Sequence, residues 1–104
     1  MLDTIVKEQK LYLVHCGFYD PQTSFGGVYE GHTNLILVAD SARSARLKAK
    51  SLDIYKEKRM HIDGIQEIIA VDGYKVALIK DTTLKHTKEI KAYSFQDLAE
   101  LELT

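Results

Sequence analysis

The fold of this chain is decided by residues 59–79, RMHIDGIQEIIAVDGYKVALI, in which two apolar runs are joined by Asp72-Gly73. An Asp-Gly pair between two β-prone runs supplies the positive φ angles that a tight type I′ turn requires. The stretch therefore predicts a β-hairpin. The pairs expected across the turn are Val71 with Tyr74, Ile69 with Val76, and Glu67 with Leu78.

Both faces of this predicted hairpin carry mostly apolar side chains. One face is expected to hold Asp63, Ile65, Glu67, Ile69, Val71, Tyr74, Val76 and Leu78, and the other Ile62, Ile68, Ala70, Ala77 and Ile79. An antiparallel sheet with one face in water alternates more cleanly between apolar and polar residues. We therefore expect a helix to cover one face, and the C-terminal segment or a second copy of the chain to cover the other.

The length and composition predict one globular domain, residues 1–104, with residues 1–10 as a mobile arm or a short turn of helix. Hydrophobic residues make up 45% of the 104 residues and charged residues 28%, which excludes a disordered chain. The 14 basic and 15 acidic side chains nearly cancel. No strong long-range attraction to nucleic acid or to a membrane follows from this balance.

The single cysteine, Cys16, excludes an internal disulfide and is typical of a reducing compartment. Its position in an apolar run indicates a buried side chain, with a reactive thiol as the alternative. The longest apolar runs, residues 35–39 and 68–71, are far shorter than the roughly 20 residues of a membrane span. We expect a cytoplasmic protein without a membrane partner.

Taken in order, the chain predicts an α+β fold. Residues 11–18, LYLVHCGF, indicate a central strand buried on both faces, with His15 and Cys16 on opposite sides. Residues 32–39 form the next expected strand, and the small apolar residues of 41–55 indicate an amphipathic helix. Residues 94–97, SFQD, fit a capping box before a short C-terminal helix. We expect two layers: a mainly antiparallel sheet of about four strands, one main helix on it, and the short helix.

The segment of residues 19–31, YDPQTSFGGVYEG, reads as a long loop because it holds the only proline and three of the six glycines. Structureless connections of this length are uncommon in compact domains and are often functional. Its aromatic residues Tyr19, Phe25 and Tyr29 suggest that the loop folds back onto the body of the domain, where it can cover a ligand.

Four polar residues at the starts of two strands are the candidate site: Glu30 with His32, and His61 with Asp63. Residues two apart on a strand share a face. If the strands are adjacent, His15 joins His32 and His61, and three imidazoles with a carboxylate suit zinc or a similar ion. No HExxH or CxxC spacing is present, so the sequence assigns no metal and no cofactor.

Two other interpretations of these residues stay open. His32 or His61, oriented by Asp63 or Glu30, suits acid/base catalysis. The same residues also suit a structural role in which hydrogen bonds fix the loop to the sheet.

Seven basic residues between positions 43 and 59, opposed by Asp53 and Glu57, form a basic segment in and after the predicted helix. This segment indicates either a solvated helix face or a contact with a phosphate or another anion. The basic residues are Arg43, Arg46, Lys48, Lys50, Lys56, Lys58 and Arg59.

Three segments together resemble the bacterial family of domains of unknown function numbered 1543. They are His15-Cys16-Gly17, then Glu30-Gly31-His32 before residues 35–39, and residues 60–63, MHID, with 71–74, VDGY. The family often has an acidic residue after the histidine of the second strand, where this chain has Thr33. The resemblance implies that Glu30, His32, His61 and Asp63 are the positions to test, and it implies no reaction. Some members hold two copies of the domain in one chain, which implies self-pairing for a single copy.

The sequence thus predicts a homodimeric module that binds a small-molecule ligand or a protein. The expected ligand-binding residues are Glu30, His32, His61, Asp63, Tyr19 and Tyr29. The first alternative is a metal-assisted or histidine-dependent enzyme with His32, His61 and Asp63 as its catalytic candidates and His15, His32 and His61 as metal-ligand candidates. The second is weak nucleic-acid binding through the basic helix.

Overall fold

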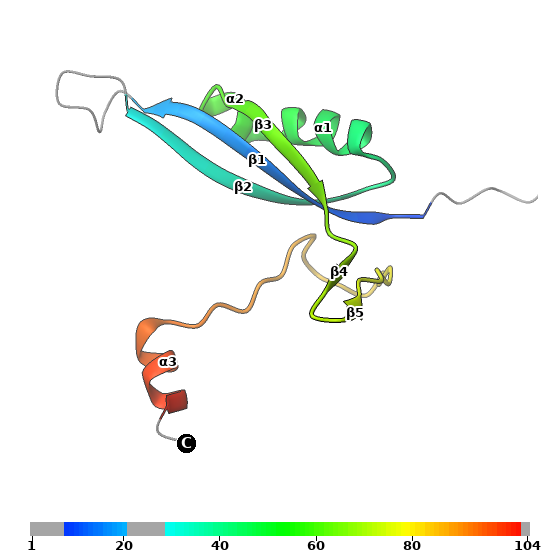
Figure 1. The fold of residues 1–104 in the computed structure, drawn as a ribbon, viewed down its shortest axis with the longest axis vertical. Helices are drawn as coiled ribbons and strands as arrows, with labels where there is room; N and C mark the ends of the chain where they lie inside the picture. Colours follow the sequence, from blue (N-terminus) through cyan, green and yellow to red (C-terminus); the bar gives the residue numbers. More distant parts are fainter. Residues whose placement is uncertain (1–7, 21–28, 103–104) are drawn as a thin grey trace, which may run out of the picture.

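The structure is a computed structural model that describes residues 8–20 and 29–102. Its elements, in chain order, are β1 (Lys10–Asp20), β2 (Tyr29–Ala39), α1 (Ala42–Ser51), α2 (Asp53–Glu57), β3 (His61–Glu67), β4 (Ala70–Val71), β5 (Tyr74–Lys75) and α3 (Phe95–Glu102). The strands and helices confirm the predicted α+β class (Figure 1). The predicted arm lies mostly in residues 1–7, outside the described residues.

Strands β1, β2 and β3 form an antiparallel sheet in the order β2-β1-β3, so β1 is the central strand as predicted. Gly17 of β1 lies opposite His32 of β2 and His61 of β3. The prediction that this strand is buried on both faces was wrong. Its buried hydrophobic side chains, Tyr12, Val14 and Cys16, all lie on one face, and the residues that alternate with them are partly exposed.

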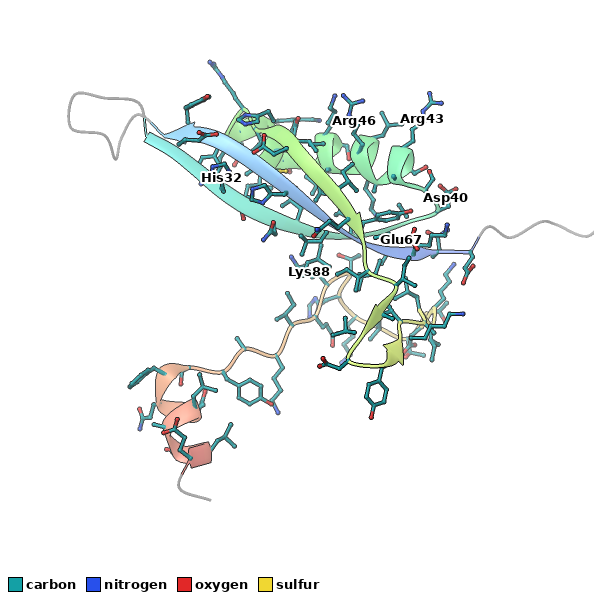
Figure 2. The ribbon with its side chains drawn as sticks, viewed as in Figure 1. His32, Asp40, Arg43, Arg46, Glu67 and Lys88 are labelled. Carbon is teal, nitrogen blue, oxygen red and sulfur yellow. The ribbon has the colours of Figure 1, made fainter. Side chains whose placement is uncertain are left out.

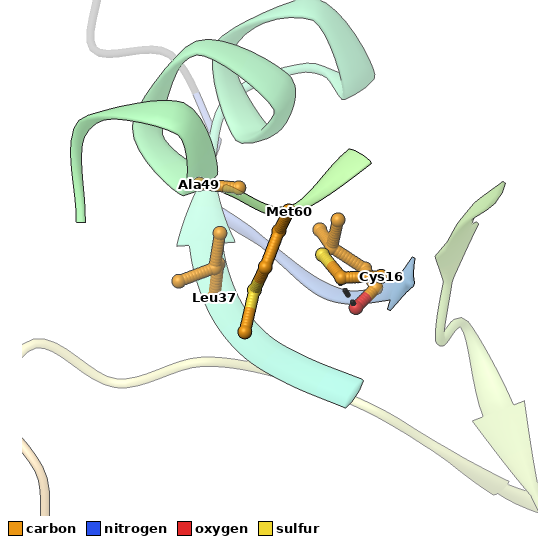
Figure 3. Close-up of a cluster of buried hydrophobic side chains, with 5 residues drawn as sticks. Cys16, Leu37, Ala49 and Met60 are labelled. Carbon is orange, nitrogen blue, oxygen red and sulfur yellow. Dashed lines mark hydrogen bonds between the residues drawn. The ribbon is translucent and has the colours of Figure 1, made fainter. Parts of the chain in front are cut away.

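Helix α1 covers that buried face of the sheet (Figure 1). Ala45 and Ala49 have no exposed surface, and their small side chains let the helix backbone lie close to the strands. The main core cluster consists of Val14, Cys16, Leu37, Ala49 and Met60 (Figure 3).

The predicted helix 41–55 is in fact two helices, because the chain breaks at Leu52 (φ −71°, ψ 141°). Ser41 caps the first helix, since its hydroxyl oxygen accepts a hydrogen bond from the Ser44 amide. The extended backbone at Leu52 turns its partly buried side chain into the core beside α1.

Cys16 is a core residue, as predicted, and its thiol is buried beneath α1. Burial raises the pKa of this thiol, and the negative charge of Asp63 raises it further. The thiol is therefore neutral and packs as a small apolar group, which removes the support for a reactive cysteine.

Strand β3 carries a β-bulge at Asp63. Ile62 lies opposite Cys16 and Gly64 lies opposite His15, so Asp63 is an extra residue between two paired positions. As a result Ile62 and Ile65 both pack against the core under α1. The expectation that Asp63 and Ile65 share a face was wrong, because it assumed an unbroken alternation.

The predicted turn at Asp72-Gly73 is confirmed. Both residues have positive φ, 53° and 82°, and Val71 pairs with Tyr74. The Val76 amide donates to the Ile69 carbonyl over 2.8 Å, which continues this ribbon by one further bond.

The hairpin is nevertheless much shorter than predicted, because the first half of residues 59–79 pairs elsewhere. Glu67 lies opposite Tyr12 of β1 and not opposite Leu78. Strand β1 offers β3 a longer partner than the chain after the turn does. The predicted helix cover of the hairpin was also wrong, since Val71 and Tyr74 are 55% and 79% exposed and α1 lies on the other sheet.

Helix α3 begins with the predicted capping box. The Ser94 amide donates to the Asp97 carboxylate over 2.9 Å, and the Asp97 amide donates to the Ser94 hydroxyl over 3.1 Å. These hydrogen bonds lower the pKa of Asp97 below its ordinary value. The expected docking of α3 on the sheet was wrong, because Phe95 is 89% exposed and the helix lies away from both sheets (Figure 1).

None of the helices in the described residues is both long enough and apolar enough to cross a membrane.

Candidate functional site on the open sheet face

The face of the β2-β1-β3 sheet opposite α1, called here the open face, has a polar end and an apolar end. Figure 2 shows His32 on this face, while Arg43 and Arg46 project from α1 on the other side of the molecule. The polar end holds His15, Tyr19, Glu30, His32, Asn34, His61 and Asp63, and the apolar end holds Leu11, Leu13, Ile36 and Val38.

Two imidazoles and two carboxylates alternate in a closed arrangement at the polar end, which we call the His–carboxylate ring: His32, Asp63, His61 and Glu30. Asp63 lies between the histidines, with Oδ1 3.1 Å from His61 Nε2 and Oδ2 3.5 Å from His32 Nδ1. On the other side, Glu30 Oε1 lies 3.7 Å from the Nε2 atoms of both histidines. The four side chains are 35–45% exposed, so a ligand can reach them from solvent.

The ring lies over a gap in the sheet surface at Gly17. A Cβ atom at this position would lie 2.5 Å from His61 Nε2 and 3.0 Å from Asp63 Oδ2. Gly17 sits between His32 and His61 on the neighbouring strands. The ring therefore occupies the space that a side chain at position 17 would fill. A glycine is therefore required here for packing and not for backbone conformation.

His15 supports the ring from one side. Its imidazole stacks on that of His32, with ring centroids 5.1 Å apart and an interplanar angle of 5°. His15 Nδ1 lies 2.9 Å from Asn34 Oδ1, within hydrogen-bonding distance. This contact fixes the orientation of His15 and, through stacking, limits the motion of His32.

Within residues 8–20 and 29–102, two overlapping groups of three residues place their ligand atoms within 4.8 Å of one another, as metal binding requires. One is His15, His32 and Asp63, and the other is Glu30, His61 and Asp63. The three strands that carry these residues are thus adjacent in the sheet, but neither group contains all three imidazoles. The expected set of His15, His32 and His61 divides between the two groups, and Asp63 belongs to both.

The aromatic residues expected to cover the site are placed only in part. Tyr19 is 58% exposed, and its ring centroid lies 6.1 Å from that of His61. The side chain of Tyr29 and residues 21–28, including Phe25, lie outside the described residues. The prediction of a loop over 19–31 needs correction, because β1 extends to Asp20 and β2 begins at Tyr29.

Gly17 and Asn34 were not among the site residues predicted from the sequence, although both shape the site. Asn34 follows His32 by two residues, so the strand alternation already indicated that they share a face. The role of Gly17 depends on the pairing of β1 with β2 and β3, which no local pattern indicates.

The basic segment lies on the other side of the sheet, and two of its side chains have partners within the chain. Lys48 Nζ donates to the Val38 carbonyl over 3.0 Å. Lys58 Nζ lies 4.4 Å from the centre of the Phe18 ring. Because of these contacts, fewer of the seven basic side chains are available to bind the phosphate backbone of a nucleic acid.

A separate hollow of about 180 Å³ lies between the start of β1 and the hairpin. Its charged lining residues include Glu8, Lys10, Glu67 and Lys75. Lys10 Nζ lies 4.0 Å from Glu67 Oε1, so these opposite charges in the hollow offset one another. No histidine lines it.

Comparison with known proteins identifies a family. A model of the family described as Domain of Unknown Function (DUF1543) matches residues 28–78 and confirms the resemblance in the sequence. The matched residues include all four members of the His–carboxylate ring, whereas His15 and Gly17 precede them. No curated protein and no solved structure matches the chain. The match places residues 28–78 in the DUF1543 family.

Proposed function

We propose that this chain is a self-associating binding module, which holds a small ligand at the His–carboxylate ring and pairs with a second copy through the apolar end of the open face. The observation that carries the proposal is the gap at Gly17, where a Cβ atom would lie 2.5 Å from His61 Nε2. The gap allows four polar side chains from two strands to converge above the central strand.

The chemistry of the ring supports ligand binding over a purely structural role. Polar groups buried in a protein interior nearly always have hydrogen-bond partners. Here Glu30 and His32 are 43% and 45% exposed, and three of the four ring distances, 3.5–3.7 Å, are longer than good hydrogen bonds. A ligand can therefore improve the contacts of these side chains.

Exposed apolar side chains support the self-association. Ile36 and Val38 are 49% and 37% exposed on β2, opposite Leu13 and Leu11 of β1. A second copy that presents the same strip would bury both strips about a two-fold axis. The strip adjoins the ring, because Asn34 and Ile36 are neighbours on the same face.

We expect Ile36→Asp to convert a dimer into a monomer, because it places a charge in the paired strip. Sedimentation equilibrium over a range of protein concentrations measures the mass. Leu47→Asp is the matched control: Leu47 is 59% exposed on α1, on the opposite side of the sheet, and its substitution should leave the dimer intact. A wild-type protein that stays monomeric at every concentration would refute the self-association.

A His-dependent enzyme is a second candidate, favoured by the 3.1 Å contact between His61 Nε2 and Asp63 Oδ1. A carboxylate in this position holds the imidazole in one orientation, as general-base catalysis requires. A cytoplasmic location is also proposed, supported by the buried free thiol of Cys16.

A further inference from the structure

We propose that the ligand of the ring is a divalent first-row transition-metal ion, bound by Glu30 Oε1, His61 Nε2 and Asp63 Oδ1. The inference rests on the proposed function in one respect, namely that the ring is the ligand site. It adds the chemical class of the ligand and the three atoms that hold it.

The two distances from His61 Nε2 to the carboxylate oxygens are close to those between ligand atoms around a bound ion, and all three residues place ligand atoms within 4.8 Å of one another. Two ligand atoms about 2.1 Å from one metal ion, at angles of roughly 90–110°, lie about 3.0–3.4 Å apart. His61 Nε2 lies 3.1 Å from Asp63 Oδ1 and 3.7 Å from Glu30 Oε1. Glu30 is 43% exposed, so its side chain can rotate to bring Oε1 closer to the other two atoms.

The donor set selects the class of ion. Two carboxylates supply two negative charges that offset those of a dication, and an imidazole favours zinc, iron, nickel or cobalt over calcium and magnesium. No thiolate is at hand, because Cys16 is buried on the opposite face. Three protein ligands leave positions for water or a second ligand, as in catalytic metal sites.

The overlapping group of His15, His32 and Asp63 is a poorer site. The lone pair of an imidazole nitrogen lies in the plane of its ring. Because the rings of His15 and His32 are stacked 5.1 Å apart at an interplanar angle of 5°, their lone pairs run in parallel planes and do not converge on one ion. His15 is also held by Asn34.

His32 is assigned as a positioning residue. Its Nδ1 faces Asp63 Oδ2 at 3.5 Å, and this is the oxygen that does not face His61. Its Nε2 faces Glu30 at 3.7 Å. Contacts of this kind hold carboxylate ligands in place, and their loss typically lowers metal affinity by about 10- to 100-fold.

The test is isothermal titration of tag-free protein with ZnCl₂. We expect one ion per chain, and a loss of affinity of at least about 100-fold for Asp63→Asn, Glu30→Gln and His61→Gln, since each removes a ligand. His86→Gln is the matched control, because His86 is exposed and lies outside both groups. Thermal unfolding in the absence of zinc checks that each variant is folded.

His15→Gln separates the two groups. We expect it to lower zinc affinity far less than Glu30→Gln does. The reverse order would overturn the assigned ligands, and so would a His86→Gln variant that loses as much affinity as His61→Gln. If no zinc binds while Ile36→Asp still breaks the dimer, the metal inference fails and the proposed self-association survives.

Discussion

Gly17→Ala is expected to lower zinc affinity by about 100-fold while the protein remains folded. The added methyl group would lie 2.5 Å from His61 Nε2, which is closer than real Cβ contacts allow, and 3.0 Å from Asp63 Oδ2, which is a tight contact. Both atoms are at the ends of side chains that can swing toward solvent. The strand pairing therefore survives, and the ligand atoms move apart.

Gly64→Ala is the matched control for this substitution. Gly64 also lies in the sheet, opposite His15, and a Cβ there would have no heavy atom within 4 Å. We expect this variant to bind zinc like the wild type in the same titration. A Gly17→Ala protein with unchanged zinc affinity would show that the space at Gly17 is not part of the site.

Met60→Ala is expected to lower the free energy of unfolding by about 2–5 kcal/mol, because it leaves a cavity in the core. Met60 is 6% exposed and belongs to the cluster between α1 and the sheet (Figure 3). It immediately precedes β3, so its side chain anchors the strand that carries His61 and Asp63. Urea unfolding followed by circular dichroism measures the change.

Leu47→Ala provides the comparison for Met60→Ala. Leu47 lies on α1 and is 59% exposed, so its truncation should change stability by only about 0.5 kcal/mol. An equal loss of stability in the two variants would mean that the core under α1 is not where the structure places it.

Local signals in the sequence predicted those elements that depend on neighbouring residues. The turn at Asp72-Gly73 needs positive φ at both positions, and the cap at Ser94 needs a carboxylate three residues later. Both predictions were confirmed because the required contacts are made within a few residues. The break at Leu52 was missed because tertiary packing, and not helix propensity, decides its conformation.

Pairing between distant strands was the part that the sequence did not predict. The alternation of residues 59–79 suits either a long hairpin or a strand beside β1, and only the second buries Ile62 and Ile65 under α1. The bulge at Asp63 follows from that choice, because it keeps both isoleucines on one face. Cross-strand register has no local signature in this sequence.

The candidate site was predictable at the level of residue pairs. Glu30 with His32, and His61 with Asp63, share faces because each pair is two residues apart on a strand, and the structure brings the two pairs together. The contribution of Gly17 could not be predicted, since it depends on which strands lie on either side of β1.

The most direct measurement of ligand binding at the ring is a long-range ¹H–¹⁵N spectrum of the four histidine side chains, recorded during titration with ZnCl₂. We predict a large shift of the His61 nitrogens, smaller shifts for His32 and His15, and none for His86, which is exposed outside the ring. Equal shifts of all four imidazoles, or a shift confined to His86, would contradict the site.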